Sequence, residues 1–548
     1  MRITLALLCV LARAAWADPP QSPPEVLTGD RLSVETRFAE YFYANSNGQV
    51  NVPLATGDPV VDNIETTQGS VPGPFGGQSM NCRSCHLIDE VQDTAGQRSY
   101  ADFARHSPIP ARAEDGLTTT PRNSPPLVNA LIPRRAGFFL HLDGEFTTPE
   151  ALVKATLTGR NYGWFPDERA TAVAHIANVI RSDDGSAVTA NKFGNIPYFA
   201  VFNGTGPVYP TDLFVPTSYQ IDVTTASDEE VLDAVARFVT AYMRSLVFFQ
   251  DTDGNYNGTA YDLFLARNQL PHQPRRGESE LAYSRRLRRA LGRLTNPQFV
   301  TPADKTLELH NHPFQFGPQE LAGLRIFLTE GRHRASAKQL QQGGVGNCVS
   351  CHPAPDFTDF SFHNTGASQE EYDSAHGQGT FAALSVPALQ ARNANPAQYL
   401  PPSAAYPNAL STFRAVASAA QPGFTDLGLW NIYQNPAFPD PVQQQAIEQM
   451  ICASMKGCGG RAPDRLLDAA LGLFKTPGLR DLGHSNPYLH TGRMDAVEDV
   501  IAFYQSSSTA ARAGVLRNGA HELAGIALVP NDIAPLAAFL RSLDEDYR

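Results

Sequence analysis

Two five-residue segments decide how this chain is organised: Cys82-Arg83-Ser84-Cys85-His86 and Cys348-Val349-Ser350-Cys351-His352. Both have the pattern C-x-x-C-H, which is the attachment signature of c-type haem. Two thiols three residues apart on a helical turn can reach the two vinyl groups on one edge of a haem, and the histidine that follows points its imidazole at the iron. The alternative is a pair of structural cysteine motifs, as disulfides or as halves of one zinc site, but a histidine follows both pairs. The sequence therefore predicts two covalent c-type haems.

The separation of the two motifs, about 266 residues, suggests one domain around each haem. The chain has 548 residues, more than one folding unit of roughly 100–200 residues needs. It contains 42 glycines and 42 prolines but only 18% charged residues, a mix typical of long ordered connections. We therefore expect a mainly α fold with two cytochrome c-like haem domains, long loops and an insertion in the C-terminal domain.

Apolar spacing predicts amphipathic helices and no strand-rich region. The clearest helices are expected at 150–158, 229–249, 318–330, 495–504 and 532–543. Asn531 and Asp532 stand at the expected N-cap of the last one. The predicted divisions are a signal peptide at 1–17, an N-terminal extension at 18–79, a first haem domain at 80–300, and a second at 301–548 with a poorly periodic insertion at about 366–465.

The first seventeen residues have the features of a secretory signal peptide. Met1-Arg2 is a short basic start, Ile3 to Leu11 is an apolar run, and Ala15-Trp16-Ala17 fits a cleavage site. We therefore expect export to the periplasm, where Cys452 and Cys458 would form a disulfide, with free thiols as the alternative. No stretch of eighteen apolar residues follows, so no membrane span is expected. The formal net charge of −12 argues against nucleic acid as a partner.

Three further segments resemble the bacterial di-haem cytochrome c peroxidase and MauG family. Their order and their placement relative to the haem motifs match that family over about 80–500. The segments are Pro121–Pro125 with Leu127–Ala130 and Asp143-Gly144, Val231–Phe249 running into Tyr261–Leu265, and Phe474–Asp481 with Pro487–Gly492. The resemblance implies that the first haem is reactive and bound by His86, whereas the second stores electrons and is bound by His352.

The same resemblance implies the sixth ligand of the second iron. In the family this ligand lies fourteen residues beyond the histidine that corresponds to His490, which here is Tyr504. Peroxidases of the family place methionine there, and MauG-like members place tyrosine, so Tyr504 points to the MauG-like branch. Met494 is the rival ligand. Tyr504 also lies on one apolar helical face with Val497 and Ile501, so it could serve the core, the haem, or both.

A calcium ion between the haems is also implied by the resemblance. Its protein ligands would be the side chain of Asn123 and the backbone carbonyls of Ser485 and Pro487, and hard oxygen donors suit this ion. Residues 251–257 resemble a calcium-binding loop as well, but Tyr256 stands where the sharp turn requires glycine. A surface turn is the preferred interpretation there.

The chain departs from the family pattern around the first haem. Leu142 stands where peroxidases keep a tryptophan between the haems, and His106 is nearby but not aligned with their removable distal histidine. Cleavage of peroxide needs a base and a donor to the leaving hydroxide. Glu168 could be this base and Arg160 this donor, and the alternative is that both belong to surface ion pairs.

The preferred function is an exported di-haem enzyme that reduces hydrogen peroxide at the first haem. Its electrons would come from a small cytochrome, a copper protein or a residue on a protein substrate. One alternative is an oxygenase on the same scaffold, like the rubber-cleaving di-haem enzymes. The other is a di-haem electron carrier with both irons six-coordinate.

Overall fold

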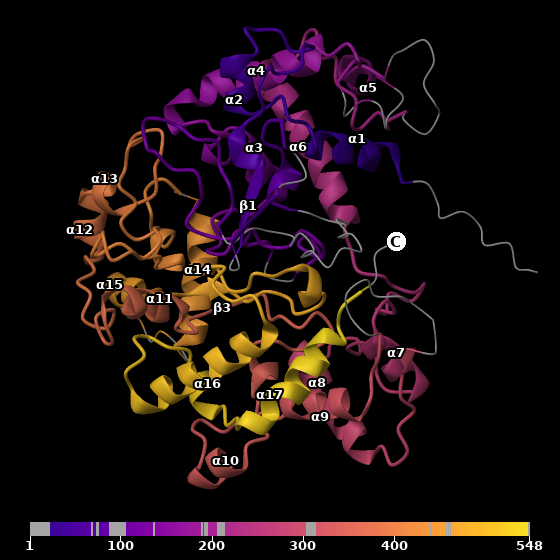
Figure 1. Cartoon of the computed structure of the whole chain (residues 1–548), viewed down its shortest axis with the longest axis vertical. Helices are drawn as coiled ribbons and strands as arrows, with labels where there is room; N and C mark the ends of the chain where they lie inside the picture. Colours follow the sequence, from indigo (N-terminus) through magenta and orange to yellow (C-terminus); the bar gives the residue numbers. More distant parts are fainter. Residues whose placement is uncertain are drawn as a thin grey trace, which may run out of the picture.

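The computed structural model is mainly helical. It describes residues 22–66, 69–72, 76–86, 106–134, 137–187, 190, 195–204, 214–302, 314–438, 440–455, 458, 460 and 462–545. The signal peptide predicted for 1–17 lies outside these residues. Among the helices described, none combines the length and the apolar character needed to cross a membrane. The chain builds three hydrophobic cores, which lie at the top, at the bottom and along one side in Figure 1.

The first core is built around α6, the helix expected at 229–249, which spans Asp228–Ser245. Its cap is a reciprocal pair: the Ser227 hydroxyl accepts from the backbone of Glu230, and the Glu230 carboxylate accepts from the backbone of Ser227. The other elements are α1 (Pro24–Ser33), α2 (Glu40–Asn45), β1 (Asn63–Thr66), β2 (Gly69–Pro72), α3 (Pro149–Leu157), α4 (Arg169–Ser182) and α5 (Tyr198–Asn203).

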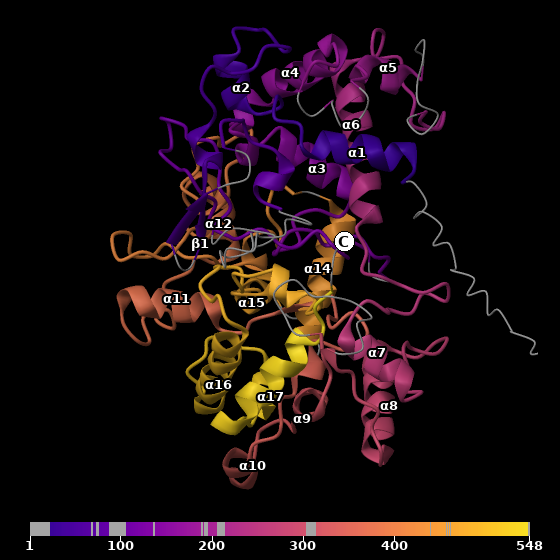
Figure 2. The same cartoon turned by 45° about the vertical axis from the view of Figure 1, so that its right-hand side comes forward.

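Helix α1 belongs to this first core, although the sequence placed it in an N-terminal extension. It packs along α6, and its Gly29 allows the close approach, because a Cβ there would lie 2.1 Å from the carbonyl oxygen of Phe238. Both views show the two helices side by side (Figures 1 and 2). The described residues before the first haem motif therefore help to build the domain that holds it.

The second core lies around the packed pair α9 and α17. Its helices are α7 (Ala260–Arg267), α8 (Glu280–Arg293), α9 (Pro318–Phe327), α10 (Ala337–Gln342), α16 (Val497–Ala513) and α17 (Pro530–Arg541). The expected N-cap of α17 was wrong by two residues: Val529 is the N-cap, and Asp532 is the third helical residue. The Asp532 carboxylate accepts from the backbone N–H groups of Val529 and Gly344, 2.9 Å each, so it still stabilises the helix start.

The third core is formed largely by the segment predicted as an insertion. It contains α11 (Ala367–His376), α12 (Leu389–Ala394), α13 (Pro396–Tyr399), α14 (Pro441–Ser454) and α15 (Pro463–Ala469). These short helices surround Trp430, and Phe139 of the first haem domain packs into the same cluster. The expected disulfide between Cys452 and Cys458 is confirmed, with 4.8 Å between their Cα atoms. Beside this core, β3 (Phe362–His363) pairs antiparallel with β4 (Phe474–Lys475).

The end of the described chain buries two carboxyl groups, Asp544 and Glu545. Glu545 accepts from the backbone N–H of Phe249 at 3.0 Å, and its own N–H donates to Asp481 at 3.0 Å, which ties the C-terminal segment to the loop after α6. Burial raises the pKa of Glu545 from 4.5 to about 8. The folded protein therefore holds a proton there that the unfolded chain has already lost at neutral pH.

This raised pKa predicts a stability that falls as the pH rises. Between the unfolded pKa of 4.5 and the folded pKa of about 8, folding takes up a proton at Glu545, so the free energy of unfolding declines by up to about 1.4 kcal/mol per pH unit. Urea unfolding between pH 6.5 and 8 checks this, because histidines of lowered pKa no longer contribute above their unfolded value of 6.5. E545Q should reduce the decline without abolishing it, because burial also raises the pKa of Asp544 to about 8 and that of Glu371 to about 7. E448Q, at an exposed site, should leave it unchanged. Equal slopes in E545Q and the wild type would refute the assignment.

Candidate haem sites and their surroundings

The first C-x-x-C-H motif forms a tight turn, the 3-10 helix η2 (Cys82–Ser84). The Asn81 side chain accepts from the backbone N–H of Ser84 at 3.1 Å, and the Ser84 hydroxyl accepts from that of Asn81 at 3.3 Å. The N–H groups of Cys85 and His86 both donate to the carbonyl of Cys82, at 3.2 and 3.0 Å. This turn brings two partly buried thiols and an imidazole together, and the thiols are not bonded to each other.

The surroundings of this turn favour the metal-binding form of its histidine. Burial lowers the pKa of His86 to about 4, although a hydrogen bond with the backbone of Pro125 acts in the opposite direction. A neutral imidazole is the form that coordinates a metal. On the thiol side, the Cys82 sulfur lies 3.2 Å from the hydroxyl oxygen of Tyr162, and the Cys85 sulfur lies 3.7 Å from the carbonyl oxygen of Pro108.

The second motif repeats the arrangement in η8 (Cys348–Ser350). The N–H groups of Cys351 and His352 donate to the carbonyl of Cys348, at 3.2 and 2.8 Å. The Nδ1 atom of His352 lies 2.8 Å from the carbonyl oxygen of Phe357. Because a carbonyl can only accept, Nδ1 carries the hydrogen and Nε2 is left with its lone pair, as in histidines that bind metals. Burial again lowers the pKa of this imidazole.

The four thiols fit haem attachment better than the structural alternatives. Each pair remains reduced, whereas Cys452 and Cys458 of the same chain are joined. Within the part of the chain that the structure describes, no cluster of metal-ligating atoms combines the two C-x-x-C pairs, which disfavours a single zinc site made from both. Two free thiols on one turn beside a neutral histidine are the donor set that a c-type haem requires.

Tyr504 lies on α16 and faces the second motif. Its pKa is raised by burial first, and then by the charges that Cys351 and Cys348 would carry, which places the phenol near both thiols. The rival residue Met494 uses its backbone carbonyl to accept from the N–H of Tyr488 at 2.6 Å. The structure therefore places Tyr504 near the thiols of the second motif, and its role as a ligand stays a prediction.

Two of the three residues implied for calcium, Asn123 and Pro487, are in contact. The Asn123 side chain donates to the carbonyl oxygen of Pro487 at 2.8 Å, and its N–H donates to the carbonyl of His490 at 3.1 Å. Ser485, two residues before Pro487, is buried. Its hydroxyl donates to the carbonyl of Asp481 at 3.1 Å. Asn123 and Pro487 are thus in direct contact, 364 residues apart in the chain.

Glu168 and Arg160, the candidate base and donor, both take part in ion pairs. Arg112 donates twice to the Glu168 carboxylate, at 2.9 and 2.8 Å, and this lowers the pKa of Glu168. Arg160 donates twice to Asp115, at 2.7 and 2.9 Å, and once to the carbonyl of Pro110 at 2.7 Å. Sequence analysis missed Arg112, because nothing in the pattern of a loop shows which distant carboxylate an arginine meets.

The loop that contains Leu142 is surrounded by a buried ion-pair network. Arg122 contacts Asp143 at 2.8 Å and pairs doubly with Asp426, at 2.5 and 2.8 Å. Arg414 contacts Glu145 at 2.6 Å. Asp426 and Arg414 come from the predicted insertion, so that segment supplies two of these five charged residues. Sequence reasoning did not single out either residue.

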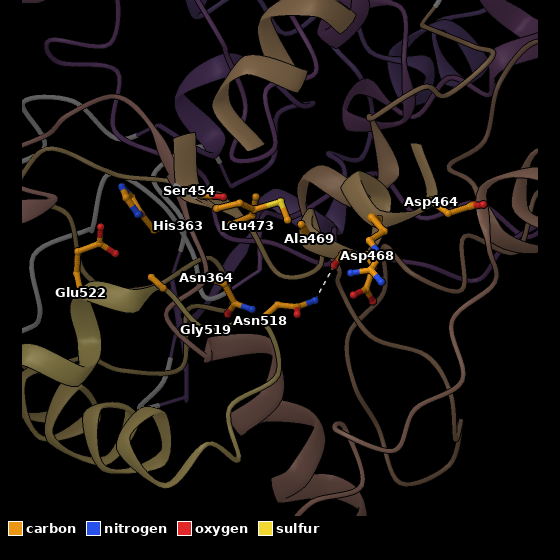
Figure 3. Close-up of a pocket in the computed structure, with 13 residues that line it drawn as sticks. His363, Asn364, Ser454, Asp464, Asp468, Ala469, Leu473, Asn518, Gly519 and Glu522 are labelled. Carbon is orange, nitrogen blue, oxygen red and sulfur yellow. Dashed lines mark hydrogen bonds between the residues drawn. The ribbon is translucent and has the colours of Figure 1, made fainter. Parts of the chain in front are cut away.

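A cavity of about 480 Å³ lies beside the second motif (Figure 3). His363 and Glu522 line it, and each offers a ligand atom within 4.8 Å of the Cys351 sulfur. The opposite wall comes from α15 and from Ser454 and Met455 near the disulfide. The cavity carries acidic groups, Glu522 among them, and connects the edge of the second motif with the third core.

Comparisons with known proteins find structures but no sequence family. No family model and no curated protein matches the chain. Among solved structures, the diheme peroxidase BthA from Burkholderia thailandensis E264 matches with 16% identity and a TM-score of 0.41 over 95% of this chain and 86% of that chain. A tyrosine-to-methionine variant of that peroxidase matches with 15% identity and a TM-score of 0.39 over the same shares. A MauG-like protein associated with microbial copper homeostasis matches with 15% identity and a TM-score of 0.40 over 98% of this chain and 95% of that chain. Because these TM-scores lie below 0.5, we base the function on the residues of this chain alone.

Proposed function

We propose that this chain is an exported, periplasmic di-haem c-type oxidoreductase of the cytochrome c peroxidase and MauG kind. Hydrogen peroxide reacts at the first haem, and electrons enter through the second. The observation that carries the proposal is the pair of matching turns, each with two free thiols and an imidazole of lowered pKa, partly buried at His86 and buried at His352. They lie against two different hydrophobic cores of one chain, so each haem would have its own domain.

His86 would be the protein ligand of the first iron, where the haem would provide the site for peroxide. Hydrogen peroxide brings the two oxidising equivalents of the reaction, and the haem, when bound, would take them up. Two side chains, those of Glu168 and Arg160, would assist the proton transfer. Glu168 is ionised, because Arg112 lowers its pKa, so a carboxylate oxygen can accept a proton and return it to the leaving oxygen. Arg160, beside Pro110, would supply positive charge where hydroxide departs.

Tyr504 would be a second protein ligand of the iron that His352 binds. A phenolate is a hard, anionic ligand that favours high oxidation states of iron, whereas methionine raises the reduction potential. The cavity beside Cys351 would be the place where an electron donor approaches the haem edge, with Glu522 and Asp468 on its wall. The donor is a small cytochrome, a copper protein or a residue on a protein substrate.

Calcium would join the two domains at Asn123, Ser485 and Pro487. Asn123 comes from the first haem domain, whereas Ser485 and Pro487 come from the second. The close contact of Asn123 with the Pro487 carbonyl supports this set, because turning the amide by half a rotation presents its oxygen beside that carbonyl. Two hard oxygens at one point, with water completing the shell, suit this ion.

The test of the proposed function is a reaction of the ferric holoprotein with one equivalent of hydrogen peroxide, followed by absorption and EPR spectroscopy. We expect the high-spin signal of the first haem to disappear and to return when a reductant is added. Y504F should convert the low-spin signal of the second haem to a high-spin one, because the sixth ligand is lost. Y399F, at a tyrosine in the third core, is the matched control and should leave both signals unchanged.

Each other outcome of this experiment rejects part of the proposal. An unaltered low-spin signal in Y504F would mean that another residue, such as Met494, binds the second iron. No response to peroxide, together with two low-spin haems, would indicate an electron carrier. A stable complex with dioxygen in the protein as isolated would indicate an oxygenase.

A further inference from the structure

Three oxidisable rings lead from the first haem motif to the surface. Tyr162 is 2% exposed, and its hydroxyl oxygen lies 3.2 Å from the Cys82 sulfur, which would be bonded to the haem edge. Trp164 follows two residues later and is 1% exposed. The Trp164 ring centre lies 5.4 Å from that of Tyr43, which is 46% exposed. The path therefore begins at a haem thiol and ends in water.

The local backbone fixes the inner part of this arrangement. The 3-10 helix η3 (Arg160–Tyr162) ends at Gly163, which has a left-handed φ of +90°. Tyr162 and Trp164 are two residues apart, so their Cα atoms lie within about 7.6 Å of each other. A Cβ on Gly163 would lie 3.0 Å from the Cβ of Glu40, the first residue of α2. Helix α2 carries Tyr43, so this glycine lets the segment of Trp164 lie against it.

The charges and protons around the path suit electron transfer. The Trp164 indole N–H donates to the carbonyl of Phe38 at 3.1 Å, which holds the ring in place. Tyr43 and Trp164 both contact the His175 ring, at 5.1 and 6.0 Å between centres. Burial lowers the pKa of His175, so no positive charge stands beside the two rings at neutral pH. Tyr43 reaches solvent, where water can take its phenolic proton.

We propose that Tyr162, Trp164 and Tyr43 form a second electron path, separate from the entry through the second haem, between the first haem and a donor bound at the surface, an inference that rests on the proposed function. Hydrogen peroxide is the oxidant. For each electron passed inward to the oxidised iron, Tyr43 becomes a neutral phenoxyl radical and its proton goes to water. A surface donor then returns one electron and one proton to Tyr43. The donor is a phenolic or indole group on a macromolecule, which cannot enter the haem pocket.

A packing role is the competing explanation, because the same rings hold α2 against α4. A phenylalanine would be sufficient for packing alone. Phe42 is an example, because its ring centre lies 6.2 Å from that of His175. The two explanations differ in one measurable respect. An electron path places a peroxide-dependent radical on Tyr43 that requires Trp164, whereas a packing cluster does not.

The experiment traps this radical in the holoprotein. One equivalent of hydrogen peroxide is added with a nitroso spin trap, and the adducts are located by peptide mass spectrometry. We expect an adduct at Tyr43 and at least tenfold less at Tyr406, which is 42% exposed and lies in the third core region. W164F should lower the Tyr43 adduct at least tenfold. W430F, at the other buried tryptophan, should leave it unchanged.

The outcomes separate the path from the proposed function. Absence of any absorption change in the wild type on adding peroxide would reject both. A normal absorption change with equal adducts at Tyr43 and Tyr406, or with no effect of W164F, would reject the path alone. If W164F fails to retain both haems, Y43F serves instead: loss of the adduct together with slower return of the oxidised protein to the ferric state supports the path, and unchanged kinetics overturn it.

Discussion

Replacing Cys82 and Cys85 together with serine should remove the first haem and abolish the response to peroxide. The two thioether bonds are the covalent link to this haem, and a hydroxyl cannot form them. The second haem, attached at Cys348 and Cys351 against another hydrophobic core, should remain. The haem content per chain should fall by half, and the intact mass should fall by one haem. Absorption after adding peroxide should then show only the unreactive second site.

Two matched variants control this experiment. C348S/C351S should lose the other haem and keep a high-spin site that reacts with peroxide but recovers slowly, because the entry point for electrons is gone. C452S/C458S removes the disulfide of the third core and should keep both haems. Retention of both haems in C82S/C85S would mean that these thiols do not hold a haem, which would contradict the proposed first haem site.

R122M should destabilise the protein more than any substitution at its surface. Arg122 pairs with Asp143 and Asp426, which are 0% and 2% exposed. Removing the arginine leaves Asp426 buried without its counter-charge and leaves Asp143 with only the longer contact to Arg414, at 3.5 Å. Breaking such a buried pair costs about 3–5 kcal/mol. Because these contacts join the loop between the haem domains to the third core, the loss affects both. Urea unfolding measures the change in the free energy of unfolding.

The matched control for R122M is R169M. Arg169 pairs with Glu229 at the surface, where both side chains are about half exposed, and an exposed pair contributes about 0–1 kcal/mol. A double variant, R122M/D426N, should recover part of the loss because one of the stranded charges is removed. If R122M and R169M were equally stable, the buried network would not hold the domains together.

The sequence predicted the helices that pack with one apolar face and did not predict the third core. Helix α6 repeats its apolar residues over eighteen positions, so its face is visible in the sequence. Helices α12, α13 and α15 have only four to seven residues, so their periodicity is too brief to detect. Helix α14 has fourteen residues but buries only Gln443, Ile447 and Ile451, so its apolar face is weak in the sequence. The helix expected at 495–504 continues to Ala513, because nothing breaks it before Gly514.

The candidate sites also divide into local features, which the sequence shows, and contacts between distant segments, which it does not. The haem motifs are local, and five consecutive residues carry the chemistry of each. The pair of Arg122 and Asp426 joins residues 304 positions apart, so only the folded chain brings them together. Tyr43 likewise meets Trp164 through the packing of α2, and neither ring carries a pattern that marks it. Local chemistry is therefore readable from the sequence, and contacts between distant segments are not.

The most direct test of two haems with different coordination is the low-temperature EPR spectrum of the resting ferric protein. The account predicts one high-spin and one low-spin signal of equal intensity, the first from the open site at His86 and the second from iron held by His352 and Tyr504. Two low-spin signals would contradict the open site, two high-spin signals would contradict ligation by Tyr504, and the absence of any haem signal would contradict the account as a whole.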